Sequence, residues 1–269
     1  MSNYKIRKPV DPHVLMLEVT GTERISPNMV RVTLGGDGLD RFTPLGYDQW
    51  FRLFLARPGQ DTLKLPTRTS GLWYAQYLAT AKQKRPYVRC YTVRGHRPGA
   101  LDVDFVVHVD ADGHSGPASS FALSAKPGEQ VGLLDQGCGY NPRAGHEWTL
   151  LVADETGLPA VAGVCESLPA DAKGIAIVEL PSLRDKQDFR VPEGVDLIWV
   201  TRDGADGVPG TLALQELQRV AFPAGDVYAY LVGESALATG ARRHLVGERQ
   251  VPKQNIDFIG YWRHGHAAM

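Results

Sequence analysis

The first half of the chain consists of short segments in which apolar and polar residues alternate. Gly, Pro and Asp residues separate these segments, which cover residues 13–19, 29–34, 50–56, 88–94, 101–109 and 130–134. Short alternating segments with turn residues between them are typical of β-strands in an all-β domain. The pattern therefore predicts a small antiparallel β-barrel.

The segment 101–109 illustrates the alternation. Successive side chains of a strand point to opposite faces, so Val103 and Phe105 share one face. Asp102, Asp104 and His108 share the other face. We expect the first face to join the core and the second to be available for binding.

From Glu147 onward, apolar segments alternate with amphipathic ones. Strands are predicted at 148–154, 174–180, 195–201, 226–232 and 257–262, and helices at 158–168, 211–222 and 235–248. Strands that alternate with helices form mostly parallel, doubly wound sheets with helices on both faces. The second half is therefore predicted to be an α/β domain that binds a nucleotide.

The segment 136–146 is rich in Gly, Pro and Asn, and the alternation changes there. We interpret it as the seam between a domain at 1–140 and a domain at 147–269. A chain of 269 residues is long enough for both domains.

Overall composition excludes several classes of protein. The formal net charge is -1, so no basic excess indicates nucleic acid or an anionic membrane surface as a partner. Three scattered cysteines are too few for a disulfide framework or a four-cysteine iron–sulfur site, and no metal site is predicted. No segment is typical of a signal peptide or a membrane span. We expect a cytoplasmic monomer without membrane insertion.

Arg89, Tyr91 and Thr92 lie in the predicted strand at 88–94. Arg89 and Tyr91 point to the same side, which places a guanidinium that binds phosphate beside a ring that can cover an isoalloxazine or its ribityl chain. Thr92 ends the strand, and its hydroxyl is a candidate to reach the redox-active N5 atom of a flavin. The alternative interpretation of this motif alone is an exposed arginine beside a cross-strand tyrosine.

A second candidate anion site begins at Gly116, which precedes Pro117 and a predicted helix. The N–H groups of Ala118 and Ser119 and the positive end of the helix dipole then face outward, where a pyrophosphate fits. An ordinary helix start has the same pattern. FAD, a dinucleotide flavin, reconciles the two anion sites. His108 is a candidate donor to the ribityl or phosphate oxygens. The alternative is a histidine at a strand end whose hydrogen bonds are made within the protein.

The second half lacks the usual Gly-rich dinucleotide motif, but two strand–turn–helix units stand in its place. The candidate cofactor contacts are Asp154, Glu155, Thr156 and Gly157 in the first unit and Gly233 and Glu234 in the second. Acidic residues there would repel a pyrophosphate, so the role of the two carboxylates after the first strand stays open.

Taken in their order along the chain, these motifs resemble those of the siderophore-interacting proteins. This family consists of FAD-dependent ferric-siderophore reductases in the ferredoxin reductase superfamily. The matching segments, which span nearly the whole chain, are RPYVRCYTVR, DFVVHVDADGHSGPASSFA, VADETGLPAV, VGESA and GYWRHG. The resemblance implies that residues 89, 91 and 92 contact the flavin. It implies also that His108 and residues 116–119 hold the ribityl and pyrophosphate portions, and that residues 154–156 adjoin the nicotinamide nucleotide.

The family usually carries a lysine in a D-x-H-V-K-L segment near the flavin, where this chain has DQWFRLF. Arg52 keeps the positive charge, although arginine and lysine bond differently, and Trp50 replaces the histidine. Arg52 is therefore the first candidate to bind an anionic ferric siderophore, and Arg143 in the seam is the second. The alternative is that both are surface arginines.

The resemblance implies that NADH or NADPH reduces FAD, which then passes single electrons to siderophore-bound Fe(III) and releases Fe(II). Tyr91 and Thr92 are the catalytic candidates in this scheme. Two alternatives stay open: a general NAD(P)H:flavin or quinone oxidoreductase, and a non-catalytic module that binds a siderophore.

Overall fold

The computed structural model describes residues 6–60, 62–107, 116–204 and 207–266. Its two compact units are Lys8–Cys138 and Gly139–Met269, and Ile6 and Arg7 group with the second unit. The division lies inside the segment 136–146, in which the sequence pattern changes.

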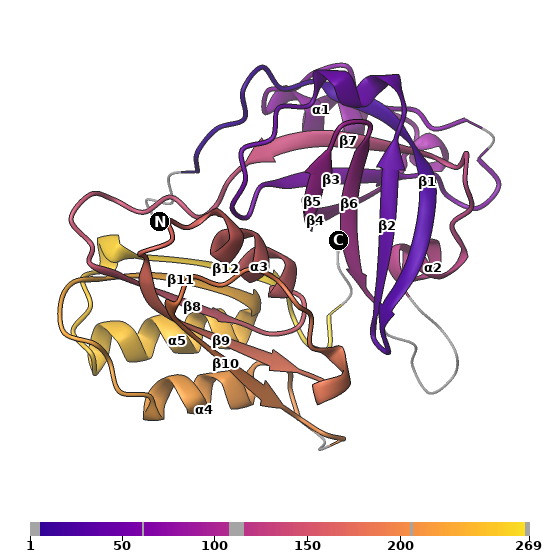
Figure 1. Ribbon diagram of the computed structural model, residues 1–269. Coiled ribbons are helices and arrows are strands. Elements are labelled where there is room, and N and C mark those ends of the chain that lie inside the picture. The colour runs from indigo at the N-terminus through magenta and orange to yellow at the C-terminus, as the bar shows by residue number, and fades with distance from the viewer. Residues whose placement is uncertain (1–5, 61, 108–115, 205–206, 267–269) are drawn as a thin grey trace. The chain divides into compact units, whose positions relative to one another are not determined.

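Among the described residues, the N-terminal unit contains an antiparallel sheet of seven strands (Figure 1). The strands are β1 (Val14–Ser26), β2 (Met29–Gly35), β3 (Trp50–Leu55), β4 (Tyr87–Thr92), β5 (Gly95–Arg97), β6 (Ala100–Val106) and β7 (Gln130–Gly137). Their spatial order is β4-β3-β7-β1-β2-β6-β5. The antiparallel fold predicted for this half is confirmed.

The two edge strands of this sheet, β4 and β5, are separated in the chain only by Val93 and Arg94. The sheet must therefore curl so that its two edges approach each other. The N–H of Arg94 accordingly donates to the carbonyl of Asp102 in β6 at 2.9 Å. The concave face encloses a core in which Val32, Phe51 and Val103 are fully buried.

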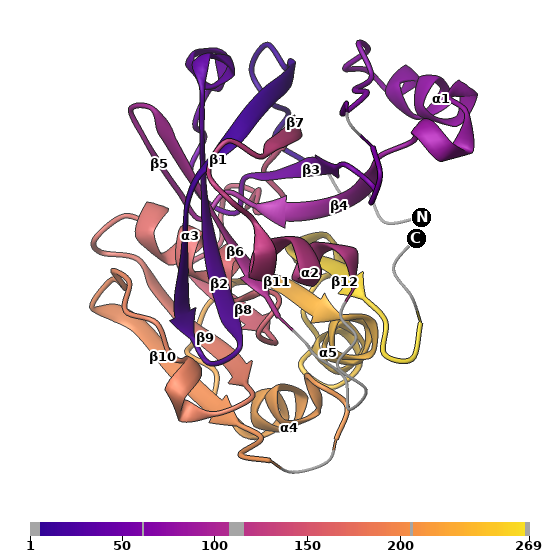
Figure 2. The same ribbon diagram turned by 90° about the vertical axis from the view of Figure 1, so that its right-hand side faces the viewer.

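Two helices accompany this sheet, α1 (Leu72–Ala79) and α2 (Pro117–Ser124). Helix α1 covers the convex side, where Trp73 packs with Phe54 of β3 and Leu134 of β7. Helix α2 contributes Phe121 and Ala122 to the core of the curled sheet. The two helices therefore pack on different sides of the unit (Figure 2).

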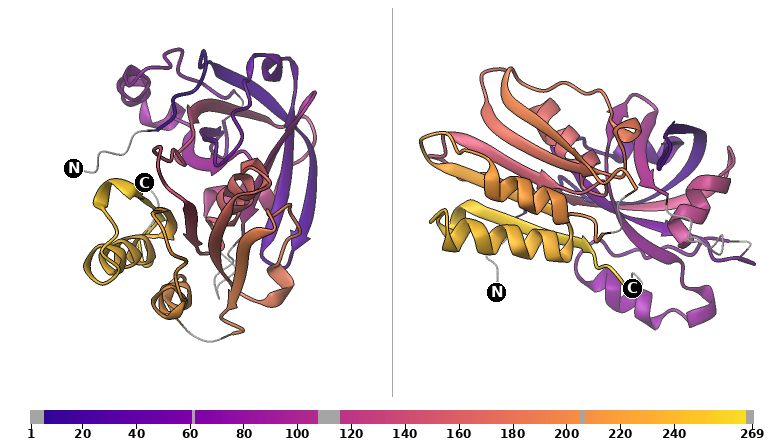
Figure 3. Two further views of the ribbon diagram at one scale, coloured as in Figure 1. Left: turned by 60° about the vertical axis from the view of Figure 1, so that its left-hand side comes forward. Right: turned by 90° about the horizontal axis from the view of Figure 1, so that it is seen from below.

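The C-terminal unit is a five-stranded parallel sheet with helices on both faces (Figure 1). Its elements are β8 (Trp148–Ala153), α3 (Leu158–Ser167), β9 (Lys173–Leu180), β10 (Gly194–Thr201), α4 (Thr211–Arg219), β11 (Val227–Glu234), α5 (Ser235–Gly247) and β12 (Ile256–Trp262). Helices α4 and α5 pack side by side on one face (Figure 3). The predicted doubly wound fold is confirmed.

In the strand order β10-β9-β8-β11-β12, the chain adds β9 and β10 on one side of β8 and then β11 and β12 on the other side. The order of the strands therefore reverses between β8 and β11. Ligands of open α/β sheets bind outside the carboxyl ends of the strands at such a reversal. The fold therefore directs attention to the residues that follow β8 and β11. Within the described part of the chain, no helix has the length and apolar character needed to cross a membrane.

Candidate functional site

Arg89 and Tyr91 lie on the face of β4 that turns toward the core of the curled sheet. Their partners in β3, Leu53 and Phe51, are fully buried core residues. The Tyr91 ring lies 4.2 Å from the ring of Phe105 in β6, at an interplanar angle of 40°. Burial raises the pKa of the Tyr91 hydroxyl well above its ordinary value, so the phenol stays neutral. The structure thus adds Phe105 to the candidate residues. The sequence pattern that could have identified Phe105 is its position on the core face of the strand predicted at 101–109.

Phe105 also connects this face to α2. The Phe121 ring lies 5.9 Å from the Phe105 ring, and the Ser119 hydroxyl donates to the carbonyl of Val106 at 3.3 Å. Gly116 is the N-cap of α2 and the helix begins at Pro117. The structure therefore brings β4, β6 and the start of α2 together (Figure 2). The predicted contact His108 lies outside the described residues.

The acidic residues of β6 lie on the strand face opposite Phe105 and are paired there. Arg31 donates to both carboxylate oxygens of Asp104, at 2.7 and 2.9 Å. Thr33 donates to Asp102 at 2.7 Å, and Arg97 forms an ion pair with Asp102. The face expected to be available for binding is thus used by these pairs.

The chemistry of the face that carries Arg89 and Tyr91 fits a flavin dinucleotide. Within the described residues, β4 and β6 present a guanidinium and aromatic rings there, and the Asp102 and Asp104 carboxylates point to the other face. The start of α2 adds free N–H groups, because the first N–H groups of a helix lack intrahelical acceptors. Cationic and N–H groups suit phosphates, and aromatic rings suit an isoalloxazine.

Thr92 and Arg52 share the opposite, convex face of β4 and β3. Thr92 is aligned with Trp50, two residues before Arg52 on the same face of β3. The Arg52 guanidinium lies 4.6 Å from the centroid of the Trp73 ring and donates to Oε1 of Gln136 at 3.2 Å. Arg52 is therefore close in register to Thr92, whereas Arg89 and Tyr91 point to the other face of the edge strand β4.

Asp154 is fully buried at the carboxyl end of β8. Its Oδ1 accepts hydrogen bonds from the N–H and hydroxyl of Thr156, and its Oδ2 accepts from the N–H of Glu234 at 2.6 Å and Nε1 of Trp262 at 3.1 Å. Burial, with a smaller contribution from Glu155, raises the pKa of Asp154 to about 6. One carboxylate thus joins the ends of β8, β11 and β12. Its contact with Trp262, 108 positions away, has no local signal in the sequence.

Glu155 is also directed inward. Its carboxylate oxygens accept from Arg202 at 2.7 and 3.0 Å, and Arg202 donates to Glu179 at 2.7 Å. Glu179 accepts from the N–H groups of Gly210 and Ala213, at 2.8 and 2.9 Å, at the start of α4. The acidic residues of the predicted cofactor turn are therefore engaged within the unit. Arg202 offsets part of the charge of Glu155 and Glu179.

The glycines of the two predicted turns are required by close packing. A Cβ on Gly157 would lie 2.7 Å from Cβ of Ala153 and from Cγ2 of Val232. Gly233 has a φ of 118°, and a Cβ there would lie 2.7 Å from Cγ of Asp154. The two turns consequently meet at the reversal point between β8 and β11.

The other predicted residues in this unit are Glu234 and Arg143. The Glu234 carboxylate caps α5 by accepting from the N–H groups of Ala236 and Leu237, and it also accepts from the N–H of His264 at 3.1 Å. Glu234 therefore has a structural role in fixing the helix start. Arg143 lies exposed in the loop before β8.

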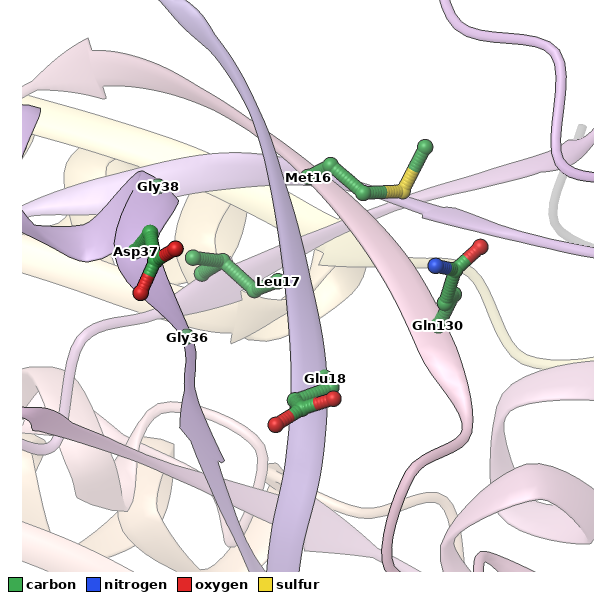
Figure 4. A pocket seen from close by; sticks show the side chains of 7 residues that line it. All are labelled: Met16, Leu17, Glu18, Gly36, Asp37, Gly38 and Gln130. Atoms are coloured by element: carbon green, nitrogen blue, oxygen red, sulfur yellow. The ribbon is translucent and has the colours of Figure 1, made fainter.

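A shallow hollow in the N-terminal unit contains none of the predicted site residues (Figure 4). It is lined by Met16, Leu17, Glu18, Gly36, Asp37, Gly38 and Gln130. The carboxylates of Glu18 and Asp37 would oppose a phosphate, so this hollow is not a candidate for the flavin.

A curled antiparallel unit followed by a doubly wound parallel unit is the fold of the ferredoxin reductases. The ferredoxin-NADP+ reductase of Plasmodium falciparum aligns with a TM-score of 0.64 at 11% identity, covering 91% of this chain and 96% of that one. The chain itself belongs to the siderophore-interacting protein family. Family models described as "Siderophore-interacting FAD-binding domain" and "Siderophore-interacting protein" match residues 18–139 and 146–265.

Similar proteins include ferric reductases. The ferric vibriobactin reductase ViuB of Vibrio cholerae is 29% identical over 255 residues, covering 93% of this chain and 89% of the relative. The NADPH-dependent ferric-chelate reductase of Escherichia coli is 28% identical over 249 residues, covering 91% of each. A solved siderophore utilization protein from T. fusca aligns with a TM-score of 0.83 at 31% identity, covering 98% of each chain. These names support an oxidoreductase of the siderophore-interacting family.

Proposed function

We propose that the chain is an FAD-dependent ferric-siderophore reductase driven by NADPH or NADH. The proposal rests on the assembly of Arg89, Tyr91, Phe105 and the start of α2, in the unit that matches a siderophore-interacting FAD-binding domain. The similarity to a ferric vibriobactin reductase and an NADPH-dependent ferric-chelate reductase supports the substrate and the electron donor. When bound, FAD supplies the chemistry, because it accepts a hydride and releases electrons singly. A need for NADPH or NADH fits a cytoplasmic reaction.

In the N-terminal unit, Arg89 is proposed to hold a phosphate oxygen by charge-assisted hydrogen bonds. The N–H groups of Ala118 and Ser119 would donate to the pyrophosphate at the start of α2. The neutral Tyr91 ring would cover the isoalloxazine and exclude water from it. The Thr92 side chain belongs to the other face of β4, but Thr92 is the last residue of this edge strand, and its hydroxyl is proposed to reach N5 around the end of the strand.

In the C-terminal unit, the edge at the end of β8 and β11 is proposed to bind the nicotinamide nucleotide. Thr156, the partly exposed residue of the turn into α3, and Gly157 beside it are the proposed contacts. Asp154 and Glu155 would act on this nucleotide indirectly, since their carboxylates hold the turn from inside. Gly233 and Glu234 would shape the neighbouring wall.

The substrate is proposed to be an anionic ferric siderophore. Its hard oxygen ligands hold Fe(III) more strongly than Fe(II), so reduction weakens the complex and releases the iron. Arg52 is half-buried on the face of β3 that continues to Thr92 at the end of β4. The anionic ligand is proposed to approach from this side and to contact Arg52 there. Arg143, exposed in its loop, is the weaker candidate.

The proposed activity is tested with purified protein, whose absorbance spectrum is expected to show flavin bands. Under anaerobic conditions, NADPH or NADH should bleach these bands, and a ferric siderophore should restore them while ferrozine traps Fe(II). Bands that recover only with quinones or free flavin would instead indicate a general reductase. A colourless protein that does not bind added FAD would overturn the assignment.

Replacing Arg52 with alanine is expected to raise the KM for a ferric catecholate roughly tenfold, because a hydrogen bond to a charged group contributes about 1.5–3 kcal/mol. An uncharged quinone serves as the control acceptor, and its KM should not change. Equal KM values of the wild-type and Arg52→Ala proteins for the ferric catecholate would remove Arg52 from the substrate site.

A further inference from the structure

Helix α1 has an outer face of aliphatic and aromatic side chains. The exposed residues of this helix are Leu72, Tyr74, Ala75, Leu78 and Ala79, which we call the α1 patch. Leu72, Tyr74 and Leu78 are 57%, 52% and 46% exposed. An ordinary surface helix turns its apolar side toward the core and its polar side outward. In α1, the exposed side carries no charged residue, and the Tyr74 hydroxyl is the polar group of its side chains.

The helix is held firmly by its other side, so the exposure of the patch does not result from a loose attachment. Trp73 is 7% exposed, and its ring meets that of Phe54 edge-on at 5.9 Å. Oε1 of Gln76 accepts from the N–H of Thr67 at 3.0 Å, and the Tyr77 hydroxyl donates to the carbonyl of Pro86 at 3.1 Å. The polar groups of the helix thus serve the anchored side.

Basic residues flank the α1 patch in the chain. Residues 62–87 contain Lys64, Arg68, Lys82, Lys84 and Arg85 but no Asp or Glu, although the whole chain has a net charge of -1. Lys64, Arg68, Lys82 and Lys84 are exposed, and we call these four residues the basic flank. The overall charge therefore conceals a local basic excess beside an exposed apolar helix face.

We propose that the α1 patch and the basic flank bind peripherally to an anionic lipid bilayer. Apolar side chains with an aromatic ring enter the headgroup boundary, and lysine and arginine beside them are attracted to anionic lipids. A second copy of this chain is the poorer occupant, because pairing two α1 patches would bring two basic flanks together. The proposal departs from the expectation of no membrane partner, which rested on net charge alone. It does not depend on the proposed reductase activity.

The test is co-sedimentation of the full-length protein, saturated with FAD, with vesicles of phosphatidylcholine alone or mixed with phosphatidylglycerol. Binding to the mixed vesicles is expected to be at least tenfold stronger and to weaken with added salt. The variants Leu72→Ser/Leu78→Ser and Lys82→Glu/Lys84→Glu should each reduce it by at least about tenfold. Leu183→Ser, which changes an exposed leucine outside the patch, is the matched control and should bind as the wild type does. Circular dichroism checks that each variant is folded.

Equal binding to both kinds of vesicle, or binding unaffected by the α1 variants, would overturn the proposal. Salt-sensitive binding to polyglutamate in the absence of vesicle binding would assign the surface to an acidic protein partner instead. Concentration-dependent dimerisation that Leu72→Ser/Leu78→Ser abolishes, again without vesicle binding, would assign it to a second copy of the chain.

Discussion

Replacing Arg202 with methionine is expected to destabilise the C-terminal unit by about 3–5 kcal/mol, the usual cost of removing one partner from a buried ion pair. Arg202 is the counterion for Glu155 and Glu179, which are 2% and 0% exposed. Without the guanidinium, two carboxylates would stay close together in the interior with no cation. Urea unfolding followed by far-UV circular dichroism measures the loss.

Arg243→Met provides the matched control for this prediction. Arg243 lies exposed on α5 in the same unit, so its replacement should change the free energy of unfolding by no more than about 0.5 kcal/mol. A loss below about 1 kcal/mol for Arg202→Met would show that the three-residue network contributes little. The loss of unfolding free energy in Arg202→Lys should lie between those of Arg202→Met and Arg243→Met, because lysine keeps the charge but lacks the forked donors of arginine.

Replacing Arg89 with alanine is expected to weaken FAD binding about 10- to 100-fold, corresponding to one hydrogen bond to a charged group. The proposed phosphate contact would be lost, while the packing of Tyr91 on Phe105 would be retained. The dissociation constant is measured by titrating apoprotein with FAD and following flavin fluorescence.

Arg97→Ala is the control for Arg89, because Arg97 belongs to the same unit and pairs with Asp102 on the opposite side of the sheet. It should leave FAD affinity unchanged. An unchanged dissociation constant in Arg89→Ala would contradict the proposed role, and the start of α2 would then be the next contact to test.

The fold was largely predictable because its elements follow local patterns. The alternation at 101–109 corresponds to β6, and the strand and helix segments after 147 correspond to β8 through β12 with α3, α4 and α5. Helix α1 was not predicted. Its sequence LWYAQYLA is apolar on almost every side, so neither the two-residue period of a strand nor the 3.6-residue period of a helix stands out.

The candidate site was predictable only where it depends on neighbours in sequence. Arg89 and Tyr91 share a strand face because of their spacing, and the start of α2 follows from Gly116 and Pro117. The orientation of Asp154 and Glu155 was not predictable. It depends on Trp262 and Arg202, which lie 108 and 47 positions away and reach the turn only in the folded unit.

The continuity of β4 and β5 has a consequence for how the protein avoids aggregation. Edge strands present unpaired backbone groups that recruit strands from other molecules. Here one short stretch, Tyr87–Arg97, supplies both edges of the seven-stranded sheet, and the curling of the sheet turns them toward each other. The two-residue connection keeps these edges close together, which leaves little room for a strand of another molecule to pair with either of them.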